Sequence, residues 1–293
     1  LVDKAPLGVC GELVPALKWV RRHRPDVRVV FGMRDIEDSP EATISQWEKA
    51  GVPEILEECF DEIWVYGVRS LFDVVREYRL SKKINSKLSF MGYVTRGPCE
   101  HAPVSGADPP SILVTVGGGT DGEFLLQTYL DDAALRLAEH GFRSVIIGGP
   151  DLAPASARSL RSQTSRVPHA EWLDFEPCVN CRIRSSELIV SMGGYNTLCQ
   201  IANNRKPALI VPRKHPRLEQ AIRAELWEQR GWGHTLDPDG LKPPALTKRI
   251  QSILEQGRVA APAELDMNGL DRICERFEAF WKPEVACAAP VCV

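Results

Sequence analysis

The stretch that decides the fold, Glu187 to Ala224, reads ELIVSMGGYNTLCQIANNRKPALIVPRKHPRLEQAIRA. An apolar run at 188–190 ends at a glycine pair, a helical pattern follows from Asn196, and a second apolar run occupies 208–211. A basic turn and a helix that begins at 219 complete the unit. This order predicts a parallel α/β unit. Backbone N–H groups at a helix N-terminus then lie beyond the carboxyl edge of the sheet and favour anionic ligands.

The same alternation of strand and helix extends in both directions along the chain. In the first part we expect strands at 27–31, 62–66 and 88–93, which are few for an independent parallel sheet. The second part adds expected strands at 112–116, 144–147, 170–173 and 233–236, and closing helices at 244–255 and 268–281. The short connections predict a doubly wound α/β domain in each half.

The residues at 96–110 are rich in Pro, Gly and small polar side chains, which indicates a linker. We therefore expect a first domain at 1–97, a linker at 98–110, a second domain at 111–282 and a tail at 283–293. The chain begins with Leu1 rather than Met, close to an expected loop at 3–8. Together with the few strands of the first sheet, this suggests that the first domain is incomplete and that an upstream segment is missing.

Composition limits the classes of function. The chain has 293 residues, 26% of them charged, and a net charge of −3, so a basic surface for nucleic acid is not expected. No apolar run approaches the roughly 20 residues of a membrane span, and no signal peptide is visible. Nine scattered cysteines indicate a reducing cytoplasm rather than a disulfide framework. We expect a cytoplasmic protein without a metal or a cofactor.

The pair Cys178 and Cys181 forms a lone C-x-x-C motif. A zinc site would need a second pair of ligands at a workable spacing, and none is near. A redox motif would be expected after the first strand of a thioredoxin-like unit, which is not present here. We expect ordinary reduced cysteines.

The first glycine turn, Gly117 to Gly122, fits G-x-G-x-x-G between an expected strand and an expected helix. A dinucleotide site would also place an acid at the end of the second strand, and residues 146–149 read IIGG instead. Two alternatives remain open. The turn excludes side chains for packing, or it faces an interdomain cleft where a substrate passes close to the backbone. We favour the cleft.

The second glycine turn, at Gly193 and Gly194, precedes a helix whose N–H groups could hold a diphosphate. Gln200 lies one turn into that helix and could reach a ribose. The alternative is a capping box formed by Thr197 and Gln200, which would only satisfy helix N–H groups. The spacing alone does not separate the two.

Charged residues at the neighbouring strand ends have two interpretations each. Arg213, in the basic loop 212–217, could neutralise phosphate or belong to a solvated loop. Glu219 and Gln220 could bind sugar hydroxyls, although an acid is also favourable in a first helical turn. Arg34 could contact an acidic or hydroxylated substrate, or form an ion pair with Asp35 or with the acids at 37 and 38. No Ser-His-Asp pattern is readable.

The stretches MGGYNTLCQIANNRKPALIVPR and EQAIRA resemble the donor-nucleotide region of GT-B glycosyltransferases. The similar family includes the peptidoglycan N-acetylglucosaminyltransferase and "predicted glycosyltransferase" relatives. In the first part the resemblance rests on VDKAPLGVCGELVPAL, VVFGMRDIEDSP, FDEIWVYG and FMGYV, and it extends to about Arg230. It implies an α/β protein of GT-B fold, with two Rossmann-like domains facing across a cleft. The acceptor would lie mainly on the first domain and a nucleotide-sugar on the second, and the last helix would cross back toward the first domain.

The resemblance also implies which residues bind the donor. These are Gly117, Gly118, Gly119, Thr120, Trp172, Leu173, Gly193, Gly194, Tyr195, Asn196, Thr197, Gln200 and Gln220. From their places at the strand ends we add Arg213 and Glu219 on the donor side, and Arg34 and Asp35 on the acceptor side. Two departures stand out, because the family usually has Glu at the position of Gln200 and carries an N-terminal Gly-x-Gly-His loop that these residues lack. No general base is identified.

These observations predict a glycosyltransferase that moves a sugar from a nucleoside diphosphate, UDP being favoured, to an acceptor hydroxyl. One alternative is a non-catalytic nucleotide-sugar-binding relative, which Gln200 and the missing loop favour. Another is a nucleotide-sugar 2-epimerase or hydrolase of the same fold, which would need paired acidic residues in the cleft. The expected partners are a nucleotide-sugar and an unknown acceptor, without nucleic acid. Peripheral association with a membrane is compatible with the sequence.

Overall fold

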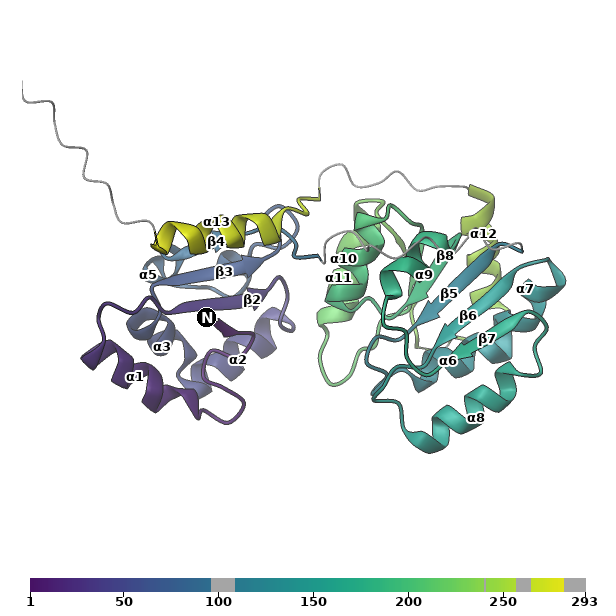
Figure 1. Cartoon of the computed structure of the whole chain (residues 1–293), viewed down its shortest axis with the longest axis horizontal. Helices are drawn as coiled ribbons and strands as arrows, with labels where there is room; N and C mark the ends of the chain where they lie inside the picture. Colours follow the sequence, from purple (N-terminus) through teal and green to yellow (C-terminus); the bar gives the residue numbers. More distant parts are fainter. Residues whose placement is uncertain (96–108, 240, 257–264, 282–293) are drawn as a thin grey trace, which may run out of the picture.

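The structure is a computed structural model that describes residues 1–95, 109–239, 241–256 and 265–281. It contains two parallel sheets, one in each half of the chain (Figure 1). The first sheet has the order β1-β2-β3-β4, and the second has the order β10-β9-β8-β5-β6-β7. The alternation of strand and helix predicted from the sequence is confirmed. Most of the predicted linker at 98–110 and all of the tail at 283–293 lie outside the described residues.

The first sheet consists of β1 (Val2–Asp3), β2 (Val30–Arg34), β3 (Glu62–Tyr66) and β4 (Leu88–Phe90). The prediction of three strands is therefore too low, because Val2 and Asp3 pair with Phe31 and Gly32 in a region expected to be a loop. A strand of two residues is too short to show an alternating pattern. The helices of this half are α1 (Leu13–His23), α2 (Pro40–Ala50), α3 (Val52–Cys59), α4 (Val74–Glu77) and α5 (Lys82–Asn85).

The second sheet consists of β5 (Ser111–Thr115), β6 (Arg143–Ile147), β7 (Ala170–Leu173), β8 (Leu188–Ser191), β9 (Ala208–Ile210) and β10 (His234–Thr235). Its helices are α6 (Glu123–Tyr129), the π-helix η1 (Leu130–Ala134), α7 (Leu135–Glu139), α8 (Pro154–Thr164), α9 (Val179–Ser185), α10 (Tyr195–Asn203), α11 (Glu219–Gln229) and α12 (Ala245–Gln256). The strand order reverses between β5 and β8. In open α/β sheets, ligands bind outside the carboxyl ends of the strands at such a point.

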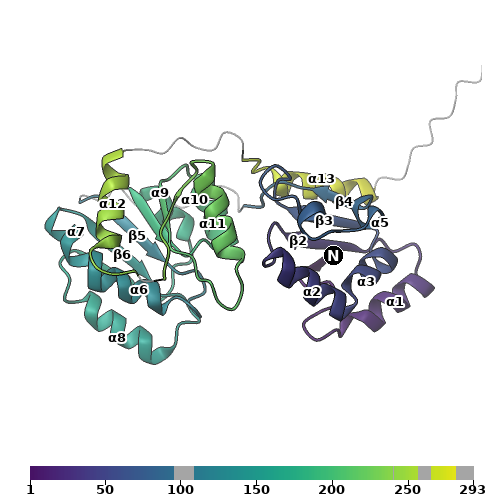
Figure 2. The ribbon, with the colours of Figure 1, turned by 180° about the vertical axis from the view of Figure 1, so that it is seen from behind.

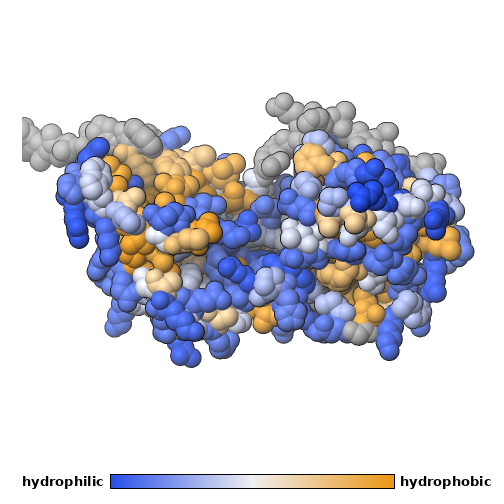
Figure 3. Space-filling model, turned by 90° about the horizontal axis from the view of Figure 1, so that it is seen from below, coloured by the Kyte–Doolittle hydropathy of each residue, from blue (hydrophilic) through white to orange (hydrophobic). Residues whose placement is uncertain are grey.

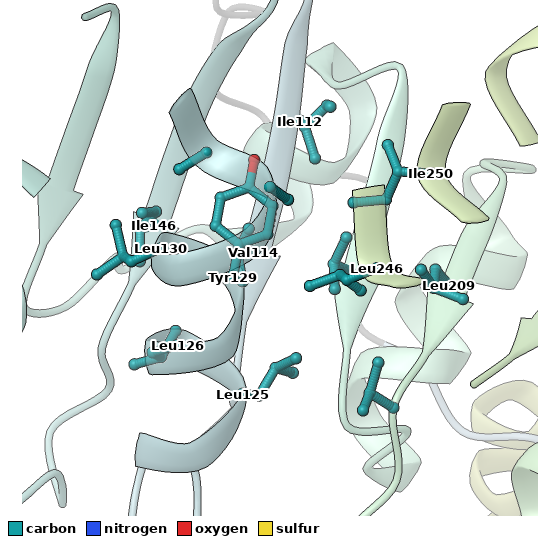
Figure 4. Close-up of a cluster of buried hydrophobic side chains, with 14 of the residues drawn as sticks. Ile112, Val114, Leu125, Leu126, Tyr129, Leu130, Ile146, Leu209, Leu246 and Ile250 are labelled. Atoms are coloured by element: carbon teal, nitrogen blue, oxygen red, sulfur yellow. The ribbon is translucent and has the colours of Figure 1, made fainter. Parts of the chain in front are cut away.

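Both faces of the second sheet are covered, which explains why its strands read as continuous apolar runs. Ile112 and Val114 of β5 pack with α6 and with Leu246 and Ile250 of α12 on one face (Figure 4). Leu113, between them in sequence, packs on the other face with residues of α10 and α11. A strand turns successive side chains to opposite faces, so every residue of this run is buried.

The last described helix, α13 (Gly269–Trp281), lies over the first sheet rather than the second (Figures 1 and 2). Trp64 of β3 packs edge-on against Phe277, with ring centroids 5.0 Å apart, and Arg276 pairs with Glu62 at 2.6 Å. The chain thus returns to its first half, as the resemblance implied. The division into domains at 1–97 and 111–282 stays a prediction, and α13 crosses it.

Hydrophobic residues gather more extensively on the first half than along the seam between the halves when the molecule is seen from below (Figure 3). No helix in the described part of the chain combines the length and hydropathy of a bilayer-spanning segment.

Candidate functional site

A cleft of about 590 Å³ lies at the point where the strand order of the second sheet reverses. Residues after β5, β6, β7 and β8 form most of its wall, and the first half and α13 complete it. It is lined by Val94, Thr95, Thr115, Gly117, Gly118, Ile147, Gly149, Pro150, Phe175, Glu176, Pro177, Val179, Asn196, Thr197, Gln200 and Leu270. Five residues of the predicted donor site are among these.

The first glycine turn satisfies both interpretations of its sequence. Gly117 has φ of +69° and no heavy atom within 4 Å of an added Cβ, so it opens onto the cleft. Gly119 has φ of +102°, and a Cβ there would lie 2.5 Å from the carbonyl oxygen of Gly148. Asp151 N–H donates to the Gly118 carbonyl at 2.8 Å. This hydrogen bond joins the first glycine turn to the turn that follows β6. Gly119 is therefore required for packing, and neither it nor Thr120 lines the cleft.

The second glycine turn delivers a helix N-terminus to the cleft. α10 begins at Tyr195, after Gly194, and no side chain caps it. Thr197 is consequently the third residue of the helix rather than its N-cap, so the predicted capping box with Gln200 is wrong. Asn196, Thr197 and Gln200 all line the cleft. The unsatisfied N–H groups and the helix dipole favour an anion at this end.

Tyr195 does not line the cleft, although it was predicted to contact the donor. It is buried, and its hydroxyl accepts a hydrogen bond from Val94 N–H of the first half at 3.1 Å. Burial raises the pKa of the Tyr195 phenol. The guanidinium carbons of Arg34 and Arg223 lie 5.5 Å and 5.8 Å from the centroid of its ring. Tyr195 therefore fastens the start of α10 to the first half.

The predicted acceptor-side residues Arg34 and Asp35 have different environments. Asp35 is buried and pairs with Arg223 at 2.8 Å, so its carboxylate is already compensated. Arg34 lies at the end of β2, and among the described residues no ion pair joins it to Asp35, Glu37 or Asp38. Its described contact is the face of the Tyr195 ring. Among the described residues, Arg34 is thus a cation beside the start of α10 that forms no ion pair with a carboxylate.

The predicted cation of the basic loop is neutralised instead. Arg213 pairs with Glu219 at 2.7 Å and with Asp121 at 3.3 Å. In the amide orientation that satisfies both of its polar atoms, Gln220 donates to the Met192 carbonyl at 2.8 Å and accepts from Arg213 Nε at 3.2 Å. Arg213, Glu219 and Gln220 do not line the cleft. They form a polar support behind it.

The wall after β7 lies slightly further along the chain than predicted. Trp172 Nε1 donates to Asp174 at 2.9 Å, and the Leu173 carbonyl accepts from Gly148 N–H at 2.9 Å. Neither residue lines the cleft, whereas residues 175–177 do. The exposed ring of Phe175, at the carboxyl end of a strand, was a readable signal that the sequence interpretation missed.

The structure also brings first-half residues to the cleft that no local pattern indicated. Val94 and Thr95 follow β4, and Leu270 belongs to α13. They reach the cleft because the chain folds the two halves together, which a strand or helix pattern does not encode. No group of three or more His, Cys, Asp or Glu side chains that could bind a metal occurs within the described residues.

Residues 111–273, more than half of the chain, match the glycosyltransferase family 28 C-terminal domain. The chain is 22% identical over 257 residues to the UDP-N-acetylglucosamine--N-acetylmuramyl-(pentapeptide) pyrophosphoryl-undecaprenol N-acetylglucosamine transferase of Glaesserella parasuis, covering 85% of this chain and 70% of that protein. It is 24% identical to an uncharacterized glycosyltransferase of Methanosarcina acetivorans, over 61% of this chain and 45% of that protein. The matched part of the chain thus covers 70% of the length of the first relative and 45% of the length of the second.

The MurG structure of Acinetobacter baumannii superimposes with a TM-score of 0.55 at 13% identity, covering 95% of this chain and 98% of that one. At this identity the likeness shows the fold alone. That fold is GT-B, as predicted from the sequence.

Proposed function

The chain belongs to the family with the glycosyltransferase family 28 C-terminal domain, and from that membership we propose that it transfers a sugar from a nucleotide-sugar, UDP-sugar being favoured, to an acceptor hydroxyl. The acceptor oxygen forms a bond to the anomeric carbon, and the bond from that carbon to the diphosphate oxygen breaks. The electron pair leaves with the nucleoside diphosphate, and the hydroxyl proton passes to a base or to solvent. The barrier falls when fixed positive charge meets the leaving diphosphate.

The observation that carries this proposal is the start of α10 in the cleft. The helix has nine residues, begins without a side-chain cap, and presents Asn196 and Thr197 to the cleft wall. N–H groups of this kind form a site that favours an anion such as a diphosphate. Gly117 supports the same position, because it follows the neighbouring strand β5 and its bare backbone lets a phosphate approach closely.

Neither Arg34 nor Arg213 lines the cleft, and we assign the cation beside the leaving diphosphate to Arg34. Arg213 already serves Asp121 and Glu219, which leaves little charge for a ligand. Arg34 contacts the ring of Tyr195, the first residue of α10, and it comes from the first half of the chain. Binding of a diphosphate would therefore draw both halves into one site.

The remaining cleft residues are assigned by their chemistry. The exposed ring of Phe175 flanks the base of the nucleotide, and Gln200, one turn into α10, reaches the ribose. The 2-epimerase and hydrolase alternative needs paired acids. Among the described residues that line the cleft, Glu176 is the one acid, and Arg182 Nε donates to it at 2.8 Å. A cytoplasmic location and peripheral contact with a membrane-bound acceptor stay proposals.

Isothermal titration calorimetry with UDP, GDP and TDP tests the proposal. We expect binding of at least one nucleoside diphosphate, with the corresponding nucleoside binding more weakly. Thr197→Tyr, which places a ring in the cleft, should abolish the heat of binding while leaving the unfolding transition in place. Absence of binding by all three diphosphates would contradict the proposal.

A further inference from the structure

The sulfur atoms of two cysteines meet at the start of α9. Cys178 immediately precedes the helix, and Cys181 is its third residue. Sγ of Cys178 donates to Sγ of Cys181 at 3.1 Å, and the structure holds both residues as thiols. Among the six cysteines in the described ranges, these two are the pair whose sulfur atoms are in contact. A disulfide bond is about 2.0 Å long, so an approach of roughly 1 Å would close it.

The local backbone keeps the two thiols close together. The N–H of Cys181 donates to the Cys178 carbonyl at 3.0 Å, which closes a turn around residues 179 and 180. The Cys178 side chain makes no capping hydrogen bond to α9, and its sulfur contacts Cys181 instead. The bond can therefore form within one turn, without unwinding the rest of the helix.

Contacts on both sides hold this turn in place. The N–H of Cys178 donates to Glu176 Oε1 at 3.1 Å, and Arg182 Nε donates to Glu176 Oε2 at 2.8 Å. On the other side, Asn204 Nδ2 donates to Asn180 Oδ1 at 2.6 Å, which ties α9 to the end of α10. These contacts keep the two sulfur atoms within reach of each other.

The two thiols differ in exposure, which gives them different roles. Cys178 is half-buried and open to a small reagent, whereas Cys181 is 6% exposed. A small disulfide therefore meets Cys178 first. Cys181 lies behind it, 3.1 Å away, and can displace the bound group in the next step. An accessible thiol with a second thiol beside it is the arrangement that converts a mixed disulfide into an internal one.

The pair adjoins the wall of the cleft at the reversal point of the second sheet. Glu176, Pro177 and Val179, the chain neighbours of Cys178, line that cleft, but neither cysteine does. Closing the bond would draw this wall toward α9 from behind. A gap of 0.5–1 Å forfeits roughly a quarter to a half of the dispersion attraction at a contact, so even a small movement alters the cleft.

We propose that Cys178 and Cys181 form a reversible dithiol–disulfide site, oxidised by a low-molecular-weight disulfide, and that their bond reshapes the cleft wall at 176–179. The Cys178 thiolate attacks one sulfur of the reagent, forms a mixed disulfide and releases the first thiolate. The Cys181 thiolate then attacks Cys178 Sγ, forms the internal bond and releases the second. The protein loses two electrons and two protons, which leave with two molecules of thiol. Control of nucleotide binding by this bond rests on the proposed function, whereas the site itself does not.

Peptide mapping of the whole chain tests the site. The chain is equilibrated with mixtures of reduced and oxidised glutathione, quenched with acid, alkylated in denaturant and digested with trypsin. Trypsin releases residues 167–182, so both cysteines lie in one peptide. We expect this peptide to change from the doubly alkylated form to the internal disulfide as oxidised glutathione rises. Exposed Cys10, which contacts no other thiol among the described residues, is the internal control and should take up glutathione.

Two substitutions separate the roles of the thiols. Cys181→Ala removes the second thiol, so glutathione should accumulate on Cys178. Cys178→Ser removes the accessible thiol, so the buried Cys181 should stay reduced. Because Cys178 is half-buried, its variant should keep the fold even if Cys181→Ala disturbs it. Equal amounts of glutathione on Cys178 in Cys181→Ala and in the original chain would contradict the proposed role of Cys181.

The indole N–H of Trp172 reports on the cleft wall in ¹H–¹⁵N spectra, because it donates to Asp174 where that wall begins. Its signal among the seven tryptophans is assigned with Trp172→Phe. Oxidation should shift this signal in the original chain but not in Cys178→Ser. The proposal is overturned if the peptide stays a dithiol in oxidised glutathione alone, or if the Trp172 signal is the same in both redox forms. Neither readout uses a nucleotide, so this proposal and the proposed function fail separately.

Discussion

Arg223 of α11 and Asp35 at the end of β2 form a buried ion pair that joins the two halves of the chain. Arg223 Nη2 lies 2.8 Å from Asp35 Oδ1, Nε lies 3.2 Å from Oδ2, and both side chains are 2% exposed. Tyr93 donates to the same carboxylate at 2.9 Å. Burial alone would lower the pKa of Arg223, but Asp35 outweighs it and raises that pKa. Arg223 also donates to the Gly193 carbonyl at 3.3 Å, so the pair supports the glycine turn before α10.

Asp35→Asn should destabilise the chain strongly, because it leaves the Arg223 guanidinium buried without its counter-charge. Losing one partner of a buried pair costs about 3–5 kcal/mol in the free energy of unfolding. Urea denaturation measures this loss. Asp26→Asn is the control, since Asp26 pairs with Arg24 at the surface, where water screens the pair, and its loss should change stability little. Equal effects of the two substitutions would show that the Arg223 pair does not stabilise the fold.

Arg34→Ala should weaken binding of the nucleoside diphosphate about tenfold, since it removes the proposed cation at the leaving group. Uridine, which carries no phosphate, should bind the variant and the original chain alike. Calorimetry at low and moderate salt measures both ligands. Arg24→Ala, a change in a surface ion pair, should leave both affinities unchanged. A uniform loss for uridine and UDP would mean that Arg34 supports the fold rather than the phosphate.

Gly117 and Gly119 should respond differently to alanine, although both have positive φ. In Gly119→Ala the new Cβ meets the Gly148 carbonyl at 2.5 Å, so we expect a loss of more than about 2 kcal/mol in unfolding free energy. In Gly117→Ala no atom obstructs the Cβ, so the loss should stay near the roughly 1–2 kcal/mol of the backbone strain. The Cβ of Gly117→Ala enters the cleft, however, and should weaken nucleotide binding. Thermal melts and calorimetry separate the two effects.

Much of the fold could be predicted from the sequence because its strands are buried on both faces. The run at 112–116 is apolar except for Thr115, since successive side chains pack on α12 and on α10. The two glycine turns could also be read from the sequence, because each follows an apolar run and precedes a helical pattern. In the structure the strand order places them beside one another, at the reversal between β5 and β8. β1 was missed because two residues are too few to show the alternation of buried and exposed side chains that is typical of a strand.

The candidate site was less predictable because several of its contacts join distant parts of the chain. Tyr195 follows a glycine turn and looks like a ligand contact, yet its hydroxyl binds Val94 N–H, 101 residues away. Arg213 looks like a phosphate-binding residue until Asp121, from another loop, is placed beside it. Pairing of this kind depends on the packing of the two halves, and local spacing does not contain it.

Glu37→Gln should stabilise the protein at neutral pH, and the gain should shrink as the pH falls. The pKa of Glu37 is raised on folding by burial, above an unfolded value near 4.5. The folded state therefore holds this proton more tightly than the unfolded chain. Its contribution to stability is complete below pH 4.5 and is lost as the pH rises through the folded pKa, where the carboxylate ionises in a buried position.

Urea denaturation between pH 5 and 7.5 measures the difference between Glu37→Gln and the original chain. Glu41→Gln, at an exposed position, is the control for removing an acid from the neighbouring part of the chain. A difference for Glu37→Gln that stays constant over this range would contradict the raised pKa of its carboxyl.

Gln200→Glu should tighten UDP binding about fivefold if this side chain meets the ribose. Gln200 lines the cleft one turn into α10, where the amide oxygen can accept one hydrogen bond from a ribose hydroxyl. A carboxylate would accept from both hydroxyls through charge-assisted bonds, which are about twice as strong. The gain should be largely absent with 2′-deoxyuridine diphosphate, which lacks one hydroxyl, and absent in Gln256→Glu, at the exposed end of α12. Calorimetry with both nucleotides decides the matter, because repulsion between the new carboxylate and the diphosphate would weaken both ligands alike, whereas a ribose contact separates them.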